Sequence, residues 1–228
     1  MMENTAQPII KLSNINYTYE DIPALNDVSL TIDRGEFIFF TGPNGCGKST
    51  LFRLLNGLIF PTSGSYIFDG KEITAKSLKD NSFAKSFHKR VGYVFQNPDL
   101  QLFNPTVYDE IAFGPRQMGL DENTVRQRVS ELLQYLQIEK LQDRAPYYLS
   151  GGEQKKTAIA AVLALNPDVL IMDEPLNGLD NKSRHWVEEF LHSFSASGKT
   201  ILIATHESEL LKLPHSRTIQ FSEDHTII

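Results

Sequence analysis

The chain is poor in cysteine: Cys46 is the single one among 228 residues, so no internal disulfide can form. It also lacks an apolar stretch near the ~18 residues that a membrane-spanning helix needs; the longest apolar runs are 37–40 and 158–165. A formal net charge of −6 argues against nucleic acid as a partner. The start, MMENTAQPIIKL, shows no signal peptide. These absences favour a cytoplasmic protein that reaches membranes only through a partner.

The hydrophobic residues of the chain follow two kinds of spacing, one typical of strands and one typical of helices. Residues 9–19 and 27–32 alternate as in an antiparallel β region, whereas about 104–166 shows mostly helical spacing. Elsewhere, short apolar runs alternate with helical patterns, which predicts an α/β fold with a parallel sheet covered by helices. The runs assigned to buried strands of this sheet are 36–41, 91–96, 168–173 and 199–205.

The stretch 42–50, GPNGCGKST, matches the phosphate-loop pattern G-x-x-x-x-G-K-[ST] and lies between a predicted strand and a predicted helix. Glycines let successive backbone N–H groups point at phosphate oxygens, and the helix start adds partial positive charge. Lys48 can reach the β and γ phosphates, while the Ser49 hydroxyl can bind Mg²⁺. The expected nucleotide-binding residues here are Gly42, Pro43, Asn44, Gly45, Cys46, Gly47, Lys48, Ser49 and Thr50.

A strand that ends in two acids supplies further candidates for phosphoryl transfer. Asp173 and Glu174 close the run VLIMDE, and alternation along a strand points them in different directions. One can serve the metal and the other can orient the attacking water. His206 follows another predicted strand, at the sheet edge where ligands bind in open α/β folds. We therefore predict a nucleoside triphosphatase site.

The segment 149–156, LSGGEQKK, resembles the signature motif of ATP-binding-cassette (ABC) ATPases, and the other motifs follow in that family's order over nearly the whole chain. These are an aromatic Tyr19, a Q-loop Gln96, a D-loop at 177–180 and a switch histidine, His206. The resemblance implies a P-loop (RecA-like) core with an antiparallel β subdomain and an inserted helical subdomain. The expected division of the single domain 1–228 is a β subdomain and core over 1–98 and 160–228, and a helical subdomain over 99–159.

The resemblance also implies a head-to-tail dimer, either a homodimer or a pair with a similar ATPase. ATP would lie between the phosphate loop of one subunit and the signature of the other. Glu174 would act as general base and His206 as a sensor of the γ-phosphate, with Lys48 on the phosphates and Tyr19 stacked on adenine. Glu153 replaces the usual signature glutamine. The implied Mg²⁺ ligands are Ser49, Gln96 and Asp173, and the implied contacts to the partner's ATP are Ser150, Gly151, Gly152, Glu153 and Asp180.

A narrower resemblance rests on FQNPDLQLF at 95–103, which looks like the ATPase subunits of energy-coupling factor (ECF) importers of cobalt, nickel, biotin and other vitamins. It implies an integral-membrane coupling subunit, a substrate-binding membrane subunit and a peripheral position on the cytoplasmic face of the membrane. Gln101 and Phe103 are expected to contact the coupling subunit. Only 22 residues follow His206 (228 − 206), so we expect no C-terminal dimerisation module.

Three other readings stay open. An ATPase of another ABC transporter class would share the enzymology and differ in its Q-loop sequence. A non-transport ABC protein acting on DNA would need a long coiled coil between Lys48 and Ser150, but these are only 102 positions apart (150 − 48), and one acting on ribosomes would need two cassettes. A P-loop kinase or GTPase would leave LSGGE and His206 unexplained.

Overall fold

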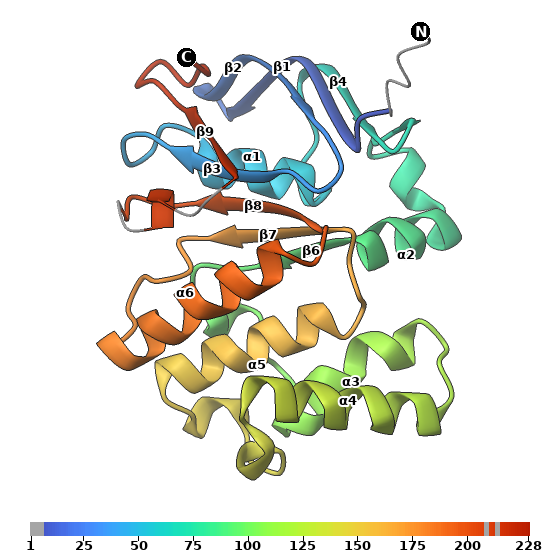
Figure 1. Ribbon diagram of the computed structural model, residues 1–228. Coiled ribbons are helices and arrows are strands. Elements are labelled where there is room, and N and C mark those ends of the chain that lie inside the picture. The colour runs from blue at the N-terminus through green and yellow to red at the C-terminus, as the bar shows by residue number, and fades with distance from the viewer. Residues whose placement is uncertain (1–6, 208–209, 213–214) are drawn as a thin grey trace, which may run out of the picture.

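The computed structural model describes residues 7–207, 210–212 and 215–228, and segment 1–6, where no signal peptide was predicted, lies outside them. Two β-sheets are stacked at one end of the molecule, and helices α3 and α4 lie at the other (Figure 1). None of the helices in the described ranges has the length and apolar character to cross a bilayer.

The first sheet is antiparallel, with strand order β2-β1-β4-β5. Strands β1 and β2 form a hairpin in which Ile10 lies opposite Ile32 and Tyr19 opposite Ile22. Val28, Leu30 and Ile32 are buried and alternate with exposed residues, so only one face of this sheet is covered. The strands are β1 (Ile10–Tyr19), β2 (Ile22–Ile32), β4 (Ser63–Phe68) and β5 (Lys71–Glu72).

The second sheet is parallel, with order β6-β7-β8-β3-β9. Its central strands are buried on both faces: in β8, Leu202 and Ala204 belong to one apolar cluster, and Ile201 and Ile203 to the other. This explains the continuous apolar runs in the sequence. The strands are β3 (Phe37–Thr41), β6 (Val91–Val94), β7 (Val169–Asp173), β8 (Thr200–Ala204) and β9 (Ser216–Gln220).

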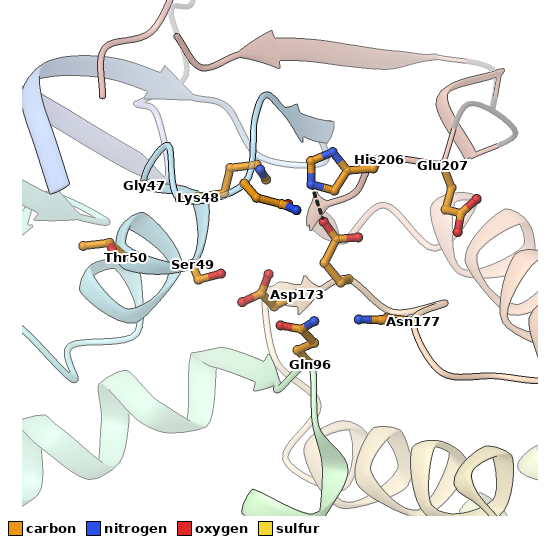
Figure 2. Close-up of a pocket in the computed structure, with 12 residues that line it drawn as sticks. Gly47, Lys48, Ser49, Thr50, Gln96, Asp173, Asn177, His206 and Glu207 are labelled. Atoms are coloured by element: carbon orange, nitrogen blue, oxygen red, sulfur yellow. Dashed lines mark ion pairs between the residues drawn. The ribbon is translucent and has the colours of Figure 1, made fainter. Parts of the chain in front are cut away.

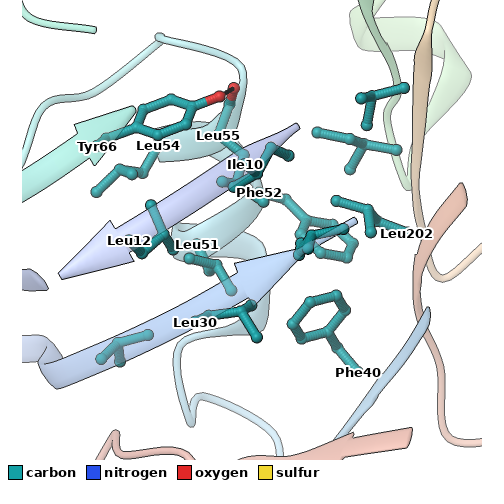
Figure 3. Close-up of a cluster of buried hydrophobic side chains, with 14 of the residues drawn as sticks. Ile10, Leu12, Leu30, Phe40, Leu51, Phe52, Leu54, Leu55, Tyr66 and Leu202 are labelled. Atoms are coloured by element: carbon teal, nitrogen blue, oxygen red, sulfur yellow. Dashed lines mark hydrogen bonds between the residues drawn. The ribbon is translucent and has the colours of Figure 1, made fainter. Parts of the chain in front are cut away.

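Helix α1 (Lys48–Leu55) is packed by side chains of both sheets. Figure 3 shows Leu51 and Phe52 of α1 among Leu12 of the antiparallel sheet and Phe40 of the parallel sheet. The ring centroids of Phe40 and Phe52 are 5.3 Å apart, edge to face. Because α1 is held from both sides, its N-terminus and the preceding loop have a fixed position at the sheet edge.

Helices α3, α4, α5 and α6 cover the other face of the parallel sheet, with α5 and α6 nearer to it than α3 and α4 (Figure 1). Helix α2 instead packs Phe87 into the apolar cluster on the α1 side, against Tyr66 and Phe68. One apolar cluster runs from Ile203 in β8 to Val129 in α4. Helix α5 crosses the predicted subdomain limit at 159/160, and the division stays a prediction. The helices are α2 (Asn81–Arg90), α3 (Val107–Gln117), α4 (Glu122–Leu136), α5 (Gly151–Leu163) and α6 (Asn181–Ser195), with 3₁₀ turns η1 (Ser77–Lys79), η2 (Pro98–Leu100), η3 (Glu139–Leu141), η4 (Pro146–Tyr148) and η5 (Leu210–Lys212).

Candidate active site

The loop between β3 and α1 needs glycine at two positions. Gly42 and Gly47 have φ of 137° and 110°, in the region that disfavours other residues. A Cβ atom would lie 2.6 Å from the Phe221 carbonyl oxygen at Gly42, and 2.3 Å from that of Ala24 at Gly47. Backbone on both sides therefore fixes the curve of the loop.

Lys48 is the first residue of α1 and is only 7% exposed. Its Nζ donates hydrogen bonds to the carbonyl oxygens of Gly42 (2.8 Å) and Pro43 (3.0 Å), and the buried Cys46 sulfur lies 3.6 Å away. The N-cap residue of α1 is Gly47, which has no side chain to cap the helix. The N-terminus of α1 and the Lys48 ammonium group together form an anion-binding arrangement. The two loop carbonyl oxygens hold the ammonium group in place.

A cleft of about 550 Å³ lies over this loop, where the strands of the parallel sheet end. Figure 2 shows Lys48, Gln96, Asp173 and His206 pointing into the same space. With Asn177 of the predicted D-loop, the structure thus brings together residues from five predicted motifs. The lining residues are Asn44, Gly45, Gly47, Lys48, Ser49, Thr50, Gln96, Asp173, Glu174, Asn177, His206 and Glu207.

Asp173 ends β7 with a side chain that is 4% exposed. Its Oδ2 accepts a hydrogen bond from the Tyr93 hydroxyl at 3.2 Å, whereas its Oδ1 is buried with no hydrogen-bond partner in the described ranges. A buried carboxylate oxygen without a partner is costly unless a cation binds there. Ser49 and Gln96 line the same cleft with oxygen atoms, the ligand type that Mg²⁺ prefers. The residues present therefore fit Mg²⁺.

Glu174 follows Asp173 in a left-handed backbone conformation (φ 42°), and its N–H donates to the Ala204 carbonyl at 2.9 Å. This conformation turns the carboxylate toward the cleft, where Oε1 lies 3.2 Å from Nε2 of His206. Burial raises the pKa of Glu174 above its ordinary value, and His206 and Lys48 only partly offset this effect. The arrangement is a carboxylate with increased proton affinity next to an imidazole.

The signature residues lie in a different cleft, of about 710 Å³, which shares no lining residue with the first. Ser150 caps α5, and the Glu153 carboxylate accepts hydrogen bonds from the Ser150 N–H and hydroxyl, both at 2.8 Å. These bonds lower the pKa of Glu153. Asp180 caps α6, where it accepts from the Ser183 N–H at 2.8 Å. The exposed Gly151 adjoins this cleft without lining it.

Gly152 of α5 lies against Ser183 of α6. A Cβ atom at this position would be 2.0 Å from the Ser183 hydroxyl oxygen. At Gly151 the nearest atom would be the Gly178 carbonyl oxygen, at 3.9 Å. The second glycine of the motif is therefore required by packing within the chain, whereas the first is not.

Tyr19 lines neither cleft. It ends β1 with an exposed ring that packs edge to face on Tyr17, with centroids 4.9 Å apart. Its hydroxyl accepts a hydrogen bond from Arg53 of α1 at 3.3 Å. Its predicted contact with adenine stays a prediction.

Gln101 and Phe103 differ in orientation. The Gln101 Oε1 accepts from the Phe95 N–H at 3.1 Å, and its Nε2 donates to the Ala158 carbonyl at 3.4 Å. The Phe103 ring is 69% exposed and contacts Phe113, with centroids 5.0 Å apart. Of the two residues expected at a partner surface, only Phe103 presents its side chain to solvent.

The sequence analysis missed three residues near the nucleotide cleft. Tyr93 donates to Asp173, and burial raises the Tyr93 pKa, so the hydroxyl remains a donor. Glu207 lines the cleft and forms an ion pair with Arg184 of α6. The third is Lys155, a buried cation of α5. Glu207 follows the predicted histidine directly and Lys155 lies within the signature segment 149–156, so both could have been found, whereas no motif marks Tyr93.

Fold and cleft together define a nucleoside triphosphatase of the P-loop class. The chain belongs to the ABC transporter family, because the family model described as "ABC transporter" matches residues 25–177. It is accordingly an ATP-binding ATPase, and its fold is that of solved ABC cassettes, as the sequence predicted.

Several known proteins are similar to the chain over nearly its whole length. The nickel import ATP-binding protein LarO of Lactiplantibacillus plantarum is 49% identical over 219 residues, covering 96% of this chain and 91% of LarO. The structure of cbiO1 from Clostridium perfringens, part of the ABC transporter complex cbiONQ, has a TM-score of 0.83 and 37% identity, covering 98% of this chain and 88% of that one. A dimeric cassette, MJ0796, in a post-hydrolysis state bound to ADP and Pi, has a TM-score of 0.82 and 28% identity, covering 96% of both chains.

Proposed function

We propose that the chain is the ATP-hydrolysing subunit of an ECF-type importer that takes up a transition-metal ion, cobalt or nickel, or a vitamin such as biotin. The observation that carries this proposal is the Q-loop sequence FQNPDLQLF in a chain whose cleft is lined by Lys48, Asp173, Glu174 and His206. Similarity to LarO and cbiO1 supports it, since one is named for nickel import and the other is part of an ABC transporter complex.

In the proposed mechanism the chain's own residues position ATP and water. When ATP binds, Lys48 exchanges its hydrogen bonds with the Gly42 and Pro43 carbonyl oxygens for bonds with the β and γ phosphates. Asp173, Ser49 and Gln96 would hold Mg²⁺, which would neutralise charge on the phosphate oxygens. Glu174 accepts the proton of the attacking water as general base, and His206, 3.2 Å from it, keeps the carboxylate oriented.

We further propose that two subunits bind head to tail. The phosphate loop and the signature line separate clefts in one chain, so Ser150, Gly151, Gly152, Glu153 and Asp180 cannot touch the ATP of their own subunit. A second, antiparallel copy or a similar ATPase would bring them over the γ-phosphate. The dimeric MJ0796 cassette supports this arrangement.

The membrane contact is proposed for a surface formed by Leu100 and Phe103. Leu100 is 78% exposed and Phe103 is 69% exposed, so both side chains are accessible to a partner. They lie in the same segment as Gln96, so a coupling subunit docked there would sense the nucleotide cleft. The chain would then lie on the cytoplasmic face of the membrane, held by the coupling and substrate-binding subunits.

Purification from native membranes tests this proposal. We expect the tagged chain to co-purify with two integral-membrane proteins, and the F103D variant to lose them while retaining its own ATPase activity. Cells lacking the chain should lose uptake of radiolabelled nickel, cobalt or biotin. Co-purification with a permease pair of another transporter class would instead support the alternative, an ATPase of that class. A chain with no membrane partner would contradict both.

A further inference from the structure

Lys155 lies in the fifth position of α5 and is one of the most deeply buried side chains, with 1% exposure. Its Nζ donates hydrogen bonds to the carbonyl oxygens of Phe95 (3.2 Å) and Gln96 (2.9 Å). These two residues follow β6 and begin the Q-loop. A cation on the signature helix therefore binds the backbone of the segment that carries a nucleotide-cleft residue.

Burying this ammonium group is unfavourable. Removing a cation from water costs several kcal/mol, and an apolar residue of similar length would fill the same space without that cost. Burial lowers the pKa of Lys155 to about 8, although Asp173 acts in the opposite direction. Packing alone therefore does not explain a lysine at this position. Its hydrogen bonds to the two carbonyl oxygens do explain it.

Two neighbouring contacts tie the same segments together. Gln154 of α5 donates to Asp99 Oδ1 at 2.8 Å. Gln101 binds the Phe95 N–H at 3.1 Å and the Ala158 carbonyl of α5 at 3.4 Å. Residues 95–101 are thus attached to α5 along their length, and Lys155 is the attachment nearest to the nucleotide cleft.

We propose that Lys155 is a positioning residue, which holds the backbone of Phe95 and Gln96 on the signature helix so that the Gln96 side chain keeps its place in the nucleotide cleft. Because α5 begins beside Ser150, the link also joins the two clefts of one chain. When a second subunit binds at Ser150 and displaces α5, Gln96 moves with it. The inference rests on the proposed contribution of Gln96 to hydrolysis.

A double-mutant cycle tests the proposal, with ATPase rates measured over a range of Mg²⁺ concentrations on K155M, Q96A and the double variant. We expect K155M to lower kcat about tenfold, to leave the KM for ATP within about twofold and to raise the Mg²⁺ concentration needed for half-maximal rate. K155R, which can still donate to both carbonyls, should restore most of the rate. The double variant should be no slower than Q96A, because Lys155 acts through Gln96.

Three results would overturn the inference. One is full activity in K155M when Q96A is impaired, and another is an additive loss in the double variant. The third is unchanged activity in Q96A, which would remove the proposed role of Gln96 itself and so is distinguishable from the first two. Melting temperatures show whether K155M folds; if it does not, K155Q replaces it, and because its shorter amide side chain keeps part of the hydrogen bonding, a smaller loss of kcat is expected.

Discussion

The two clefts of this chain are built in opposite ways. In the nucleotide cleft, Asp173 Oδ1 is buried with no hydrogen-bond partner among the residues that the structure describes, and burial raises the pKa of Glu174. At the signature, Glu153 and Asp180 already accept hydrogen bonds within the chain, and those bonds lower their pKa values. We therefore expect the first cleft to bind the nucleotide and the second to contribute only when another molecule binds there.

The largest expected effect concerns Glu174. The E174Q variant keeps the shape of the side chain but cannot accept a proton, so we expect kcat to fall roughly a thousandfold. ATP should still bind, and an ATP-dependent dimer should accumulate. Steady-state ATPase assays, nucleotide titration and gel filtration measure the three outcomes. Unchanged turnover would show that the nucleotide cleft does not depend on this carboxylate.

Lys48 should give the next largest effect. K48A removes a buried cation from the phosphate site, and we expect ATP affinity to weaken by about fiftyfold through loss of charge-assisted hydrogen bonds. Titration with a fluorescent ATP analogue measures this loss, and K79A, at an exposed lysine, is the matched control. Equal affinities in the two variants would contradict the assignment of the phosphate loop.

Glu153 tests the other side of the comparison. E153Q removes a negative charge from the helix start that a partner's γ-phosphate would approach, so ATP-dependent dimerisation should tighten about threefold. The isolated chain should lose about 0.5–1 kcal/mol of stability because the capping box is weakened. Analytical ultracentrifugation and urea unfolding measure the two effects. E139Q, on the same cleft, is the control, and weaker dimerisation in E153Q would mean that the carboxylate assists the contact.

The smallest expected effect is on stability as a function of pH. Because the folded state raises the pKa of Glu174, its stabilising contribution is complete below the unfolded pKa and is lost as pH rises through the folded pKa. Without nucleotide, E174Q should therefore melt about 2 °C higher than the parent at pH 7.5 and at the same temperature near pH 4. Scanning calorimetry measures this difference, with E223Q as an exposed control. A pH-independent difference would exclude the burial explanation.

Much of the nucleotide cleft followed from the sequence because local patterns encode it. In α/β folds, a glycine-rich loop after a buried strand and acidic residues at a strand end both lie at the carboxyl edge of the sheet. The sequence therefore predicted that Lys48, Asp173 and Glu174 belong to one site, and all three line the cleft. Secondary structure was less complete. Strand β9 was not predicted, because its residues are mostly exposed.

The sequence by itself determined that this chain is an ABC-type ATPase, because the order and spacing of its motifs can be recognised without knowing which residues are in contact. Only the tertiary structure decided which groups meet across long separations. Lys155 lies about 60 positions from the carbonyl oxygens that it binds, and Tyr93 lies 80 positions from Asp173. Such pairs are selected by the packing of α5 and β7 against β6, and a buried lysine or tyrosine has no local pattern that names its partner.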